Sequence, residues 1–175
     1  MSTLVPHHKT TFIAYIASSI DGRISLTKKS LPRWTSKEDW AFFQKSIAAA
    51  DAVVVGRNTY KAAADRLRKR RTYVFSSRIS SMRRQGAVTF LNPAHVDLSE
   101  LFGGYRKVAI LGGGGIYRFM LEKNLCDELY ITIEPLVFGR GKQMVTGGTK
   151  TQSLHLRSFK KLNKKGSLLL HYTTL

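Results

Sequence analysis

The chain has 175 residues, 43% of them hydrophobic, which is enough for one substantial core and gives no sign of a second. Its 29 basic and 11 acidic residues give a net charge of +18, which favours an anionic partner: phosphate groups, nucleic acid or an acidic surface. The sequence lacks a run of about 18 apolar residues to cross a bilayer and a signal-peptide pattern. We therefore expect one cytoplasmic domain over residues 1–175, with a flexible tail over 1–10.

The first part of the chain predicts strands that alternate with helices. An extended run over 11–18 is followed by a turn over 20–23 and a basic loop that ends at Trp34. A serine cap at Ser36 and acids in the first turn predict a helix over 36–50. The next segments continue the alternation, in chain order: strand 51–56, helix 57–67, strand 72–76, strand 87–91, short helix 97–102 and strand 107–111.

The last part of the chain predicts long strands. Residues 127–138 form the longest strand candidate, with Pro135 marking a bulge or an edge. Two further strands, over 152–162 and 167–173, are joined by a hairpin turn at 163–166. This order predicts an α/β fold with a mixed, mostly parallel sheet flanked by helices and with antiparallel C-terminal strands.

Four consecutive glycines, Gly112, Gly113, Gly114 and Gly115, separate the strand at 107–111 from a helical segment. Where a strand enters a helix through glycines, the first helical amides point outward and a phosphate can approach closely. A tight turn that needs positive φ explains one or two glycines, not four. The run therefore predicts a phosphate or diphosphate site.

The two common nucleotide-binding patterns do not fit this run. A Walker A loop needs a lysine after its last glycine, whereas Ile116 and Tyr117 follow here. The Rossmann pattern lacks its third glycine, although Glu134 lies about where a ribose-binding acid is expected. A different kind of nucleotide site is indicated.

Other short segments accompany the glycine run in a fixed order. They are SIDGRI (19–24), DAVVVGRNTY (51–60), SSR (76–78), LGGGG (111–115), CDELYITIEP (126–135) and FGRG (138–141). Their order and spacing resemble the dihydrofolate reductase-like fold and, within it, the reductase domain of riboflavin biosynthesis, over nearly the whole chain.

The resemblance implies an NADPH site spread over three loops, in which the glycine run takes the diphosphate. The cofactor contacts that it implies are Gly56, Arg57, Thr59, Ser76, Ser77, Arg78, Gly112, Gly113, Gly114, Gly115 and Ile116. The segment at 76–78 matches the one that receives the 2′-phosphate, which an arginine fork complements, and this favours NADPH over NADH. The segment at 57–59 is equally typical of a helix start. Ser76 and Ser77 are equally typical of a loop whose hydroxyls bond their own backbone. Arg78 is therefore the more specific marker of a 2′-phosphate site.

The resemblance also implies a substrate side. Asp21 would lie next to the reaction, holding substrate hydroxyls or helping to deliver the proton that accompanies hydride transfer. Asp-Gly is also the commonest hairpin-turn signal. Trp34 and Thr35 resemble a substrate-side element, although Trp34 equally fits an aromatic lid over the edge of the core.

The implied activity is NADPH-dependent reduction of the ribosyl group of a (phospho)ribosylaminopyrimidine to ribityl, by a homodimer that pairs through its tail strands. An arginine expected before the strand at 51–56 to hold the substrate phosphate is missing, with only Lys45 nearby. The alternatives are another carbonyl or imine substrate, or a dihydrofolate or pterin reductase, whose acid would lie on the first helix. There Glu38 and Asp39 are interpreted as partners of the helix dipole rather than as a pocket acid.

A non-enzymatic alternative rests on charge. Five cations in six residues at 66–71, with Arg83, Arg84 and the lysines of 160–165, are typical of a nucleic-acid-binding protein. They lack a recognised nucleic-acid motif and do not explain the glycine run. The single cysteine, Cys126, is expected to be a small buried side chain. We therefore expect a phosphorylated or heterocyclic small-molecule substrate. We do not expect nucleic acid, a metal ion or a membrane as a partner.

Overall fold

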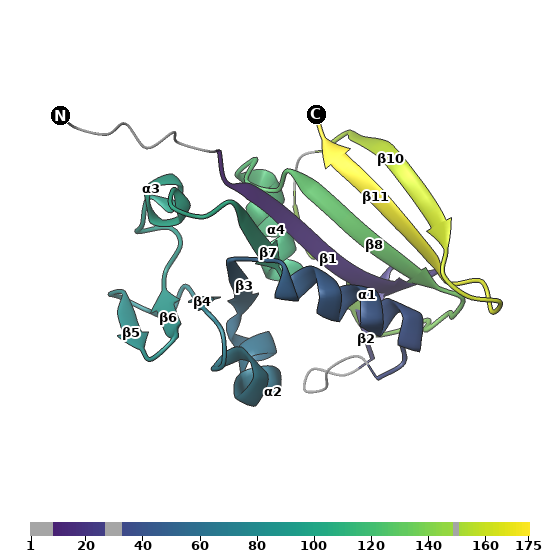
Figure 1. Cartoon of the computed structure of the whole chain (residues 1–175), viewed down its shortest axis with the longest axis horizontal. Helices are drawn as coiled ribbons and strands as arrows, with labels where there is room; N and C mark the ends of the chain where they lie inside the picture. Colours follow the sequence, from purple (N-terminus) through teal and green to yellow (C-terminus); the bar gives the residue numbers. More distant parts are fainter. Residues whose placement is uncertain (1–8, 27–32, 149–150) are drawn as a thin grey trace.

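The computed structural model describes residues 9–26, 33–148 and 151–175 (Figure 1). The helices are α1 (Lys37–Ala48), α2 (Arg57–Leu67), α3 (Leu98–Phe102) and α4 (Gly114–Glu122). The strands are β1 (Thr11–Ser19), β2 (Arg23–Ser25), β3 (Ala52–Gly56), β4 (Thr72–Phe75), β5 (Arg83–Gln85), β6 (Val88–Leu91), β7 (Lys107–Ile110), β8 (Glu128–Glu134), β9 (Lys142–Gln143), β10 (Leu154–Lys161) and β11 (Leu168–Thr174).

In this part of the chain, nine strands form one sheet in the order β10-β11-β8-β1-β7-β3-β4-β6-β5. The strands from β8 to β6 run parallel to one another. Antiparallel strands close both ends, β11 and β10 at one and β5 at the other. The short strands β2 and β9 pair separately. The predicted α/β fold, with a mostly parallel sheet and antiparallel C-terminal strands, is confirmed.

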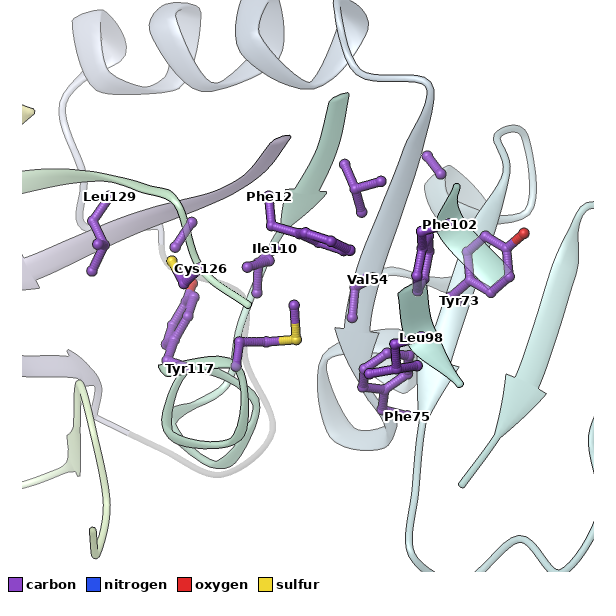
Figure 2. Close-up of a cluster of buried hydrophobic side chains, with 14 of the residues drawn as sticks. Phe12, Val54, Tyr73, Phe75, Leu98, Phe102, Ile110, Tyr117, Cys126 and Leu129 are labelled. Carbon is purple, nitrogen blue, oxygen red and sulfur yellow. The ribbon is translucent and has the colours of Figure 1, made fainter. Parts of the chain in front are cut away.

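Hydrophobic side chains cover both faces of the sheet. On one face, Ile47 of α1 and Leu67 of α2 pack with Val53 and Val55 of β3. On the other, α3 and α4 pack over Val54 and its neighbours. Figure 2 shows the second cluster, which includes Phe12, Tyr73, Phe75, Phe102, Tyr117, Cys126 and Leu129. Because helices cover both faces, β3 is a continuous apolar run rather than an alternating one.

Some predicted elements differ from the observed ones. The strand expected over 127–138 ends at Glu134, because proline at 135 has no N–H to donate and β8 has a hydrogen-bonded neighbour on each side. The interpretation of Asp21-Gly22 as a hairpin turn is wrong, because β2 pairs with β9 and not with β1. Strand β5 was missed because its charged, exposed residues carry no hydrophobic pattern.

Other local predictions are confirmed. Ser36 caps α1, and its hydroxyl accepts a hydrogen bond from the Asp39 amide. Cys126 is buried, and burial raises the pKa of its thiol to about 12, which is unfavourable for a nucleophile. The expected flexible tail is anchored at its end, because the Thr10 hydroxyl bonds the backbone oxygens of Phe102 and Tyr105; residues 1–8 lie outside the described part.

Candidate active site

A cavity of about 910 Å³ opens over the sheet on the face that carries α1 and α2. Its floor includes Tyr15 of β1 and Thr132 of β8. The predicted site residues that line it are Thr35, Gly56, Arg57, Thr59, Arg78, Gly112, Gly113, Gly114, Gly115 and Ile116. Asp21, Trp34, Ser76 and Ser77 are not among its lining residues. The structure thus brings together segments that are far apart in the sequence.

Two helices begin at one wall of the cavity. Gly113 is the N-cap of α4 and Gly56 is the N-cap of α2, and neither cap has a side chain to satisfy the first amides. The Gly56 amide donates to the Gly112 carbonyl at 3.0 Å, which holds the two helix starts side by side. The partial positive charges of both helix dipoles therefore act on the same space. This wall is suited to an anion such as a diphosphate.

The four glycines of the run differ in what a side chain at each position would meet. Gly112 has φ +105°, and a Cβ there would lie 2.8 Å from the Tyr117 hydroxyl. A Cβ on Gly114 would lie 3.0 Å from the Gln143 carbonyl oxygen. By contrast, the space at Gly115 is open, and a Cβ on Gly113 would make only an ordinary contact, 3.9 Å from Thr59. The fold therefore requires two of the glycines, and the other two leave room for a ligand.

Two arginines that line the cavity follow the neighbouring parallel strands β3 and β4. Arg57 is the first residue of α2, and Arg78 follows β4; both line the cavity. The Ser76 hydroxyl accepts a hydrogen bond from the Arg78 amide at 3.3 Å, which is the local backbone bonding that serines in loops often make. The arginines thus fit a role in anion binding better than the serines do.

Asp21 is held by the loop that follows β8. Its carboxylate accepts hydrogen bonds from the Ser19 hydroxyl at 2.6 Å and from the amides of Phe138 and Gly139 at 3.0 and 2.8 Å. These donors lower the pKa of Asp21 to about 2, with the Phe138 amide contributing most. A carboxyl with so low a pKa carries no proton near neutral pH, so these contacts favour a structural role for Asp21.

Trp34 lies against the same loop. Its ring meets that of Phe138 edge-on, with the ring centres 5.0 Å apart. This packing favours the interpretation of Trp34 as an aromatic cover rather than as a substrate contact. Its neighbour Thr35 does line the cavity, next to Asp39.

Asp39 is the site residue that the sequence interpretation missed. It was taken as a partner of the α1 dipole, but its side chain is buried and lines the cavity. A signal was present in the helical spacing, because Asp39, Phe43 and Ile47 are four residues apart and share one face of α1. An acid on the apolar stripe of a helix indicates a pocket residue rather than a solvated one.

The surroundings of Asp39 favour its protonated form. Burial raises the pKa of Asp39 above its ordinary value of 3.8, and the nearby charge of Glu134 raises it further. Hydrogen bonds with the hydroxyls of Thr132 and Thr35 act in the opposite direction, and burial outweighs them. A carboxyl held this way can donate a proton to a group in the cavity.

Cations also line the cavity between α1 and α2. They are Arg66, Lys69 and Arg70, which belong to the basic cluster at 66–71. The Arg66 guanidinium lies 5.1 Å from the ring centre of Trp40, and Arg70 donates to the Ile47 carbonyl at 2.6 Å. Part of the basic cluster thus faces a small-molecule cavity.

Two negative findings concern other kinds of site. Among the described residues, His, Cys, Asp and Glu side chains do not gather into a group of three or more that could hold a metal ion. In the same part of the chain, every helix is too short or too polar to span a bilayer.

Comparison with known proteins places the chain in a family. The model of the RibD C-terminal domain matches residues 10–168. The chain belongs to the RibD C-terminal domain family. A sequence comparison with curated proteins gives no match.

Solved structures of low sequence identity share the fold. A putative riboflavin biosynthesis protein from Shewanella sp. PV-4 superposes with a TM-score of 0.71 at 20% identity, covering 95% of this chain and 99% of that one. RibD from Acinetobacter baumannii gives 0.76 at 17%, covering 96% of this chain and 59% of that one. Dihydrofolate reductase from Enterococcus faecalis, complexed with NADP(H), gives 0.65 at 19%, covering 95% and 97%. The predicted resemblance to the dihydrofolate reductase-like fold is confirmed.

Proposed function

We propose that the protein is an NADPH-dependent reductase of the riboflavin-biosynthesis type, which reduces the ribosyl group of a (phospho)ribosylaminopyrimidine. The observation that carries the proposal is the wall where α2 and α4 both begin, with glycine caps and two arginines, facing a cavity that also holds a buried acid. Membership of the RibD C-terminal domain family supports a reductase. The NADP(H) complex of the Enterococcus enzyme supports the choice of cofactor.

The residues present fit NADPH. The open space at Gly115 and the absence of a side chain at Gly113 admit a diphosphate against the first amides of α4 and α2. Arg57 and Arg78 supply the positive charge that a 2′-phosphate requires. Bound there, NADPH would supply the hydride.

The chain's own contribution to the chemistry is a proton and a dry environment. Adding hydride to a C=N or C=O bond makes the nitrogen or oxygen basic, and the Asp39 carboxyl, whose pKa is raised by burial, lies in the cavity as the proton donor for that atom. The hydroxyls of Thr35 and Thr132 orient this carboxyl. We assign proton delivery to Asp39 rather than to Asp21, whose lowered pKa leaves it without a proton; contact between Asp21 and substrate hydroxyls stays a prediction.

The substrate class follows from the second group of cations. The arginine expected on α1 to bind a substrate phosphate is missing. The candidates that could take its place are Arg66, Lys69 and Arg70, which line the cavity. A substrate with an anionic group at one end and a reducible heterocycle or imine at the other fits this arrangement. Asp39 on the first helix also favours a second candidate, a dihydropterin-type substrate, because a ring nitrogen of a pterin needs a proton during reduction.

The choice of NADPH over NADH is tested at Arg78. In titrations followed by cofactor fluorescence, we expect Arg78→Ala to weaken NADPH binding about ten- to a hundredfold, the loss expected for one or two charge-assisted hydrogen bonds. NADH binding should change little. Arg83→Ala is the matched control, because Arg83 stacks on Phe90 outside the cavity. Equal weakening of both cofactors, or no preference for NADPH in the wild type, contradicts the proposal.

We also propose that the protein pairs with a second copy through its tail strands. β10 is the outermost strand and is exposed along its whole length. Its register with β11 puts Leu156 and Phe159 on the face of Leu170 and Tyr172, and Phe159 is 72% exposed. A sheet edge that carries exposed apolar side chains favours pairing with a strand of a second copy.

Sedimentation velocity tests the pairing. The wild type should sediment as a dimer, and Phe159→Glu should shift it toward the monomer. A wild type that remains monomeric at the highest soluble concentration rules out the tail strands as a dimer contact.

A further inference from the structure

A second buried carboxylate lies behind the pocket acid and takes no part in the reaction proposed above. Glu134, the last residue of β8, is 3% exposed, and Asp39 is 7% exposed. Burying a charged side chain is costly unless hydrogen bonds satisfy it. The contacts of Glu134 therefore indicate what it does.

One oxygen of Glu134 holds the start of α1. The Ser36 amide donates to Glu134 Oε1 at 2.7 Å. Ser36 is the N-cap of α1, and its hydroxyl accepts from the Asp39 amide at 3.3 Å. A chain of two hydrogen bonds thus leads from Glu134 to the backbone of Asp39, and it sets the position of the first turn of α1 relative to β8.

The other oxygen of Glu134 holds the tail hairpin. It accepts a hydrogen bond from the hydroxyl of Ser167, which is itself buried. Asn163 donates to Ser167 Oγ at 2.9 Å and to Glu38 at 3.3 Å, and so joins the hairpin turn to α1. Both Glu134 oxygens are satisfied, and three parts of the fold meet at this side chain.

Charged side chains from several elements share the cavity with Asp39. They are Arg57 and Arg66 on α2, Lys69, Arg70, Arg78, and Lys142 on β9. Glu38 is engaged by Asn163. Burial is the main cause that raises the pKa of Asp39, and the charge of Glu134 adds a smaller contribution in the same direction.

We propose that Glu134 is the positioning residue for Asp39: it holds the first turn of α1 against the sheet and places a fixed negative charge behind the pocket carboxyl. This charge adds to the effect of burial, which is the main reason that the pKa of Asp39 is raised. The inference rests on the proposed function only where turnover is measured, because the effect on Asp39 exists without cofactor or substrate.

The test is a carbon-13 NMR titration of the side-chain carboxyls in the full-length protein, with the Asp39 resonance assigned by its loss in Asp39→Asn. Glu134→Gln removes the charge, yet keeps an oxygen for the Ser36 amide and an amide group for the Ser167 hydroxyl. We expect the titration midpoint of Asp39 to fall, because one nearby like charge is lost. The matched control Glu38→Gln should leave the midpoint in place.

Turnover supplies a second reading of the same change. In Glu134→Gln the decline of kcat/KM at high pH should begin at a lower pH than in the wild type, with little change in kcat at low pH; a purely structural role would lower activity at every pH. An unchanged Asp39 midpoint in folded Glu134→Gln overturns the proposal. If that variant does not fold, Glu134→Asp decides: it keeps the charge but draws it back from the first turn of α1, so the Asp39 midpoint should shift, and an unchanged midpoint overturns the proposal. A shifted midpoint without NADPH binding would instead refute the proposed reductase function alone.

Discussion

Replacing Asp39 by asparagine should abolish most turnover and leave cofactor binding intact. The amide keeps the size and hydrogen bonds of the side chain but has no proton to give, so kcat/KM should fall by about 10²–10⁴, the usual contribution of a positioned general acid. The NADPH dissociation constant should stay within about twofold, because Asp39 lies on α1 and its side chain bonds Thr132 and Thr35, whereas the glycine-capped wall belongs to α2 and α4. Steady-state kinetics and fluorescence titration check the two parts.

The same substitution should stabilise the protein near neutral pH. The folded-state pKa of Asp39 is raised, so its contribution to stability is fully present below the ordinary value of 3.8 and is lost as the pH rises through the raised pKa. Asparagine has no such loss. The melting temperature of Asp39→Asn relative to wild type should therefore rise with pH above 4. Full activity in Asp39→Asn, or equal stability at all pH values, would refute the assignment of Asp39 as a buried acid.

Placing an acid at Gly115 should remove NADPH binding without harming the fold. The position has open space and lies in the first turn of α4, where a negative charge favours the helix dipole by about 0.3–1 kcal/mol. The same charge would stand against a diphosphate, and two unit charges about 4 Å apart repel by about 4 kcal/mol near a protein surface. We expect Gly115→Asp to raise the dissociation constant of NADPH at least about a hundredfold.

The neutral control for this substitution is Gly115→Asn, which has nearly the same shape. It should bind NADPH much better than Gly115→Asp, while both keep a melting temperature close to that of wild type. Comparable binding by the two variants would mean that the space at Gly115 does not receive a phosphate. Unfolding of both would mean that the open space is needed by the fold.

The fold could be predicted because its signals are local. The buried parallel strand β3 is a continuous apolar run, the N-cap of α1 is a serine followed by acids, and glycine marks the start of both α2 and α4. The missed strands β2, β5 and β9 are two or three residues long. Such short pairings depend on which segments the fold brings together rather than on their own composition.

The candidate site was predicted unevenly. The glycine run, Arg57 and Arg78 form a wall of the cavity as expected, because strand-to-helix turns of a parallel sheet meet at one edge. Asp39 lines the cavity and Asp21 does not, and the predicted contact of Asp21 with substrate stays a prediction. An Asp-Gly motif next to the first strand does not reveal that its carboxylate is taken by two amides more than a hundred residues further along the chain. To predict that Asp39 lines the cavity, the buried face of α1 must first be identified from the sequence.

The basic composition has a partial explanation in the cavity. Arg57, Arg66, Lys69, Arg70 and Arg78 all line it, so a share of the positive charge faces a small-molecule site. This arrangement fits an anionic cofactor and an anionic substrate. The cluster at 66–71 is therefore not by itself an argument for nucleic-acid binding.

The central claim is that this cavity carries hydride from NADPH to a small molecule, and transfer of isotope tests it most directly. The protein would be mixed with NADPH that carries two deuterium atoms at the nicotinamide C4 and offered phosphoribosylaminopyrimidines and dihydropterins, with the products examined by mass spectrometry. We expect one deuterium in the product of an accepted substrate, and none with Asp39→Asn over the same time. Failure of the wild type to bind NADPH, or turnover that gives a product without deuterium, would contradict the claim.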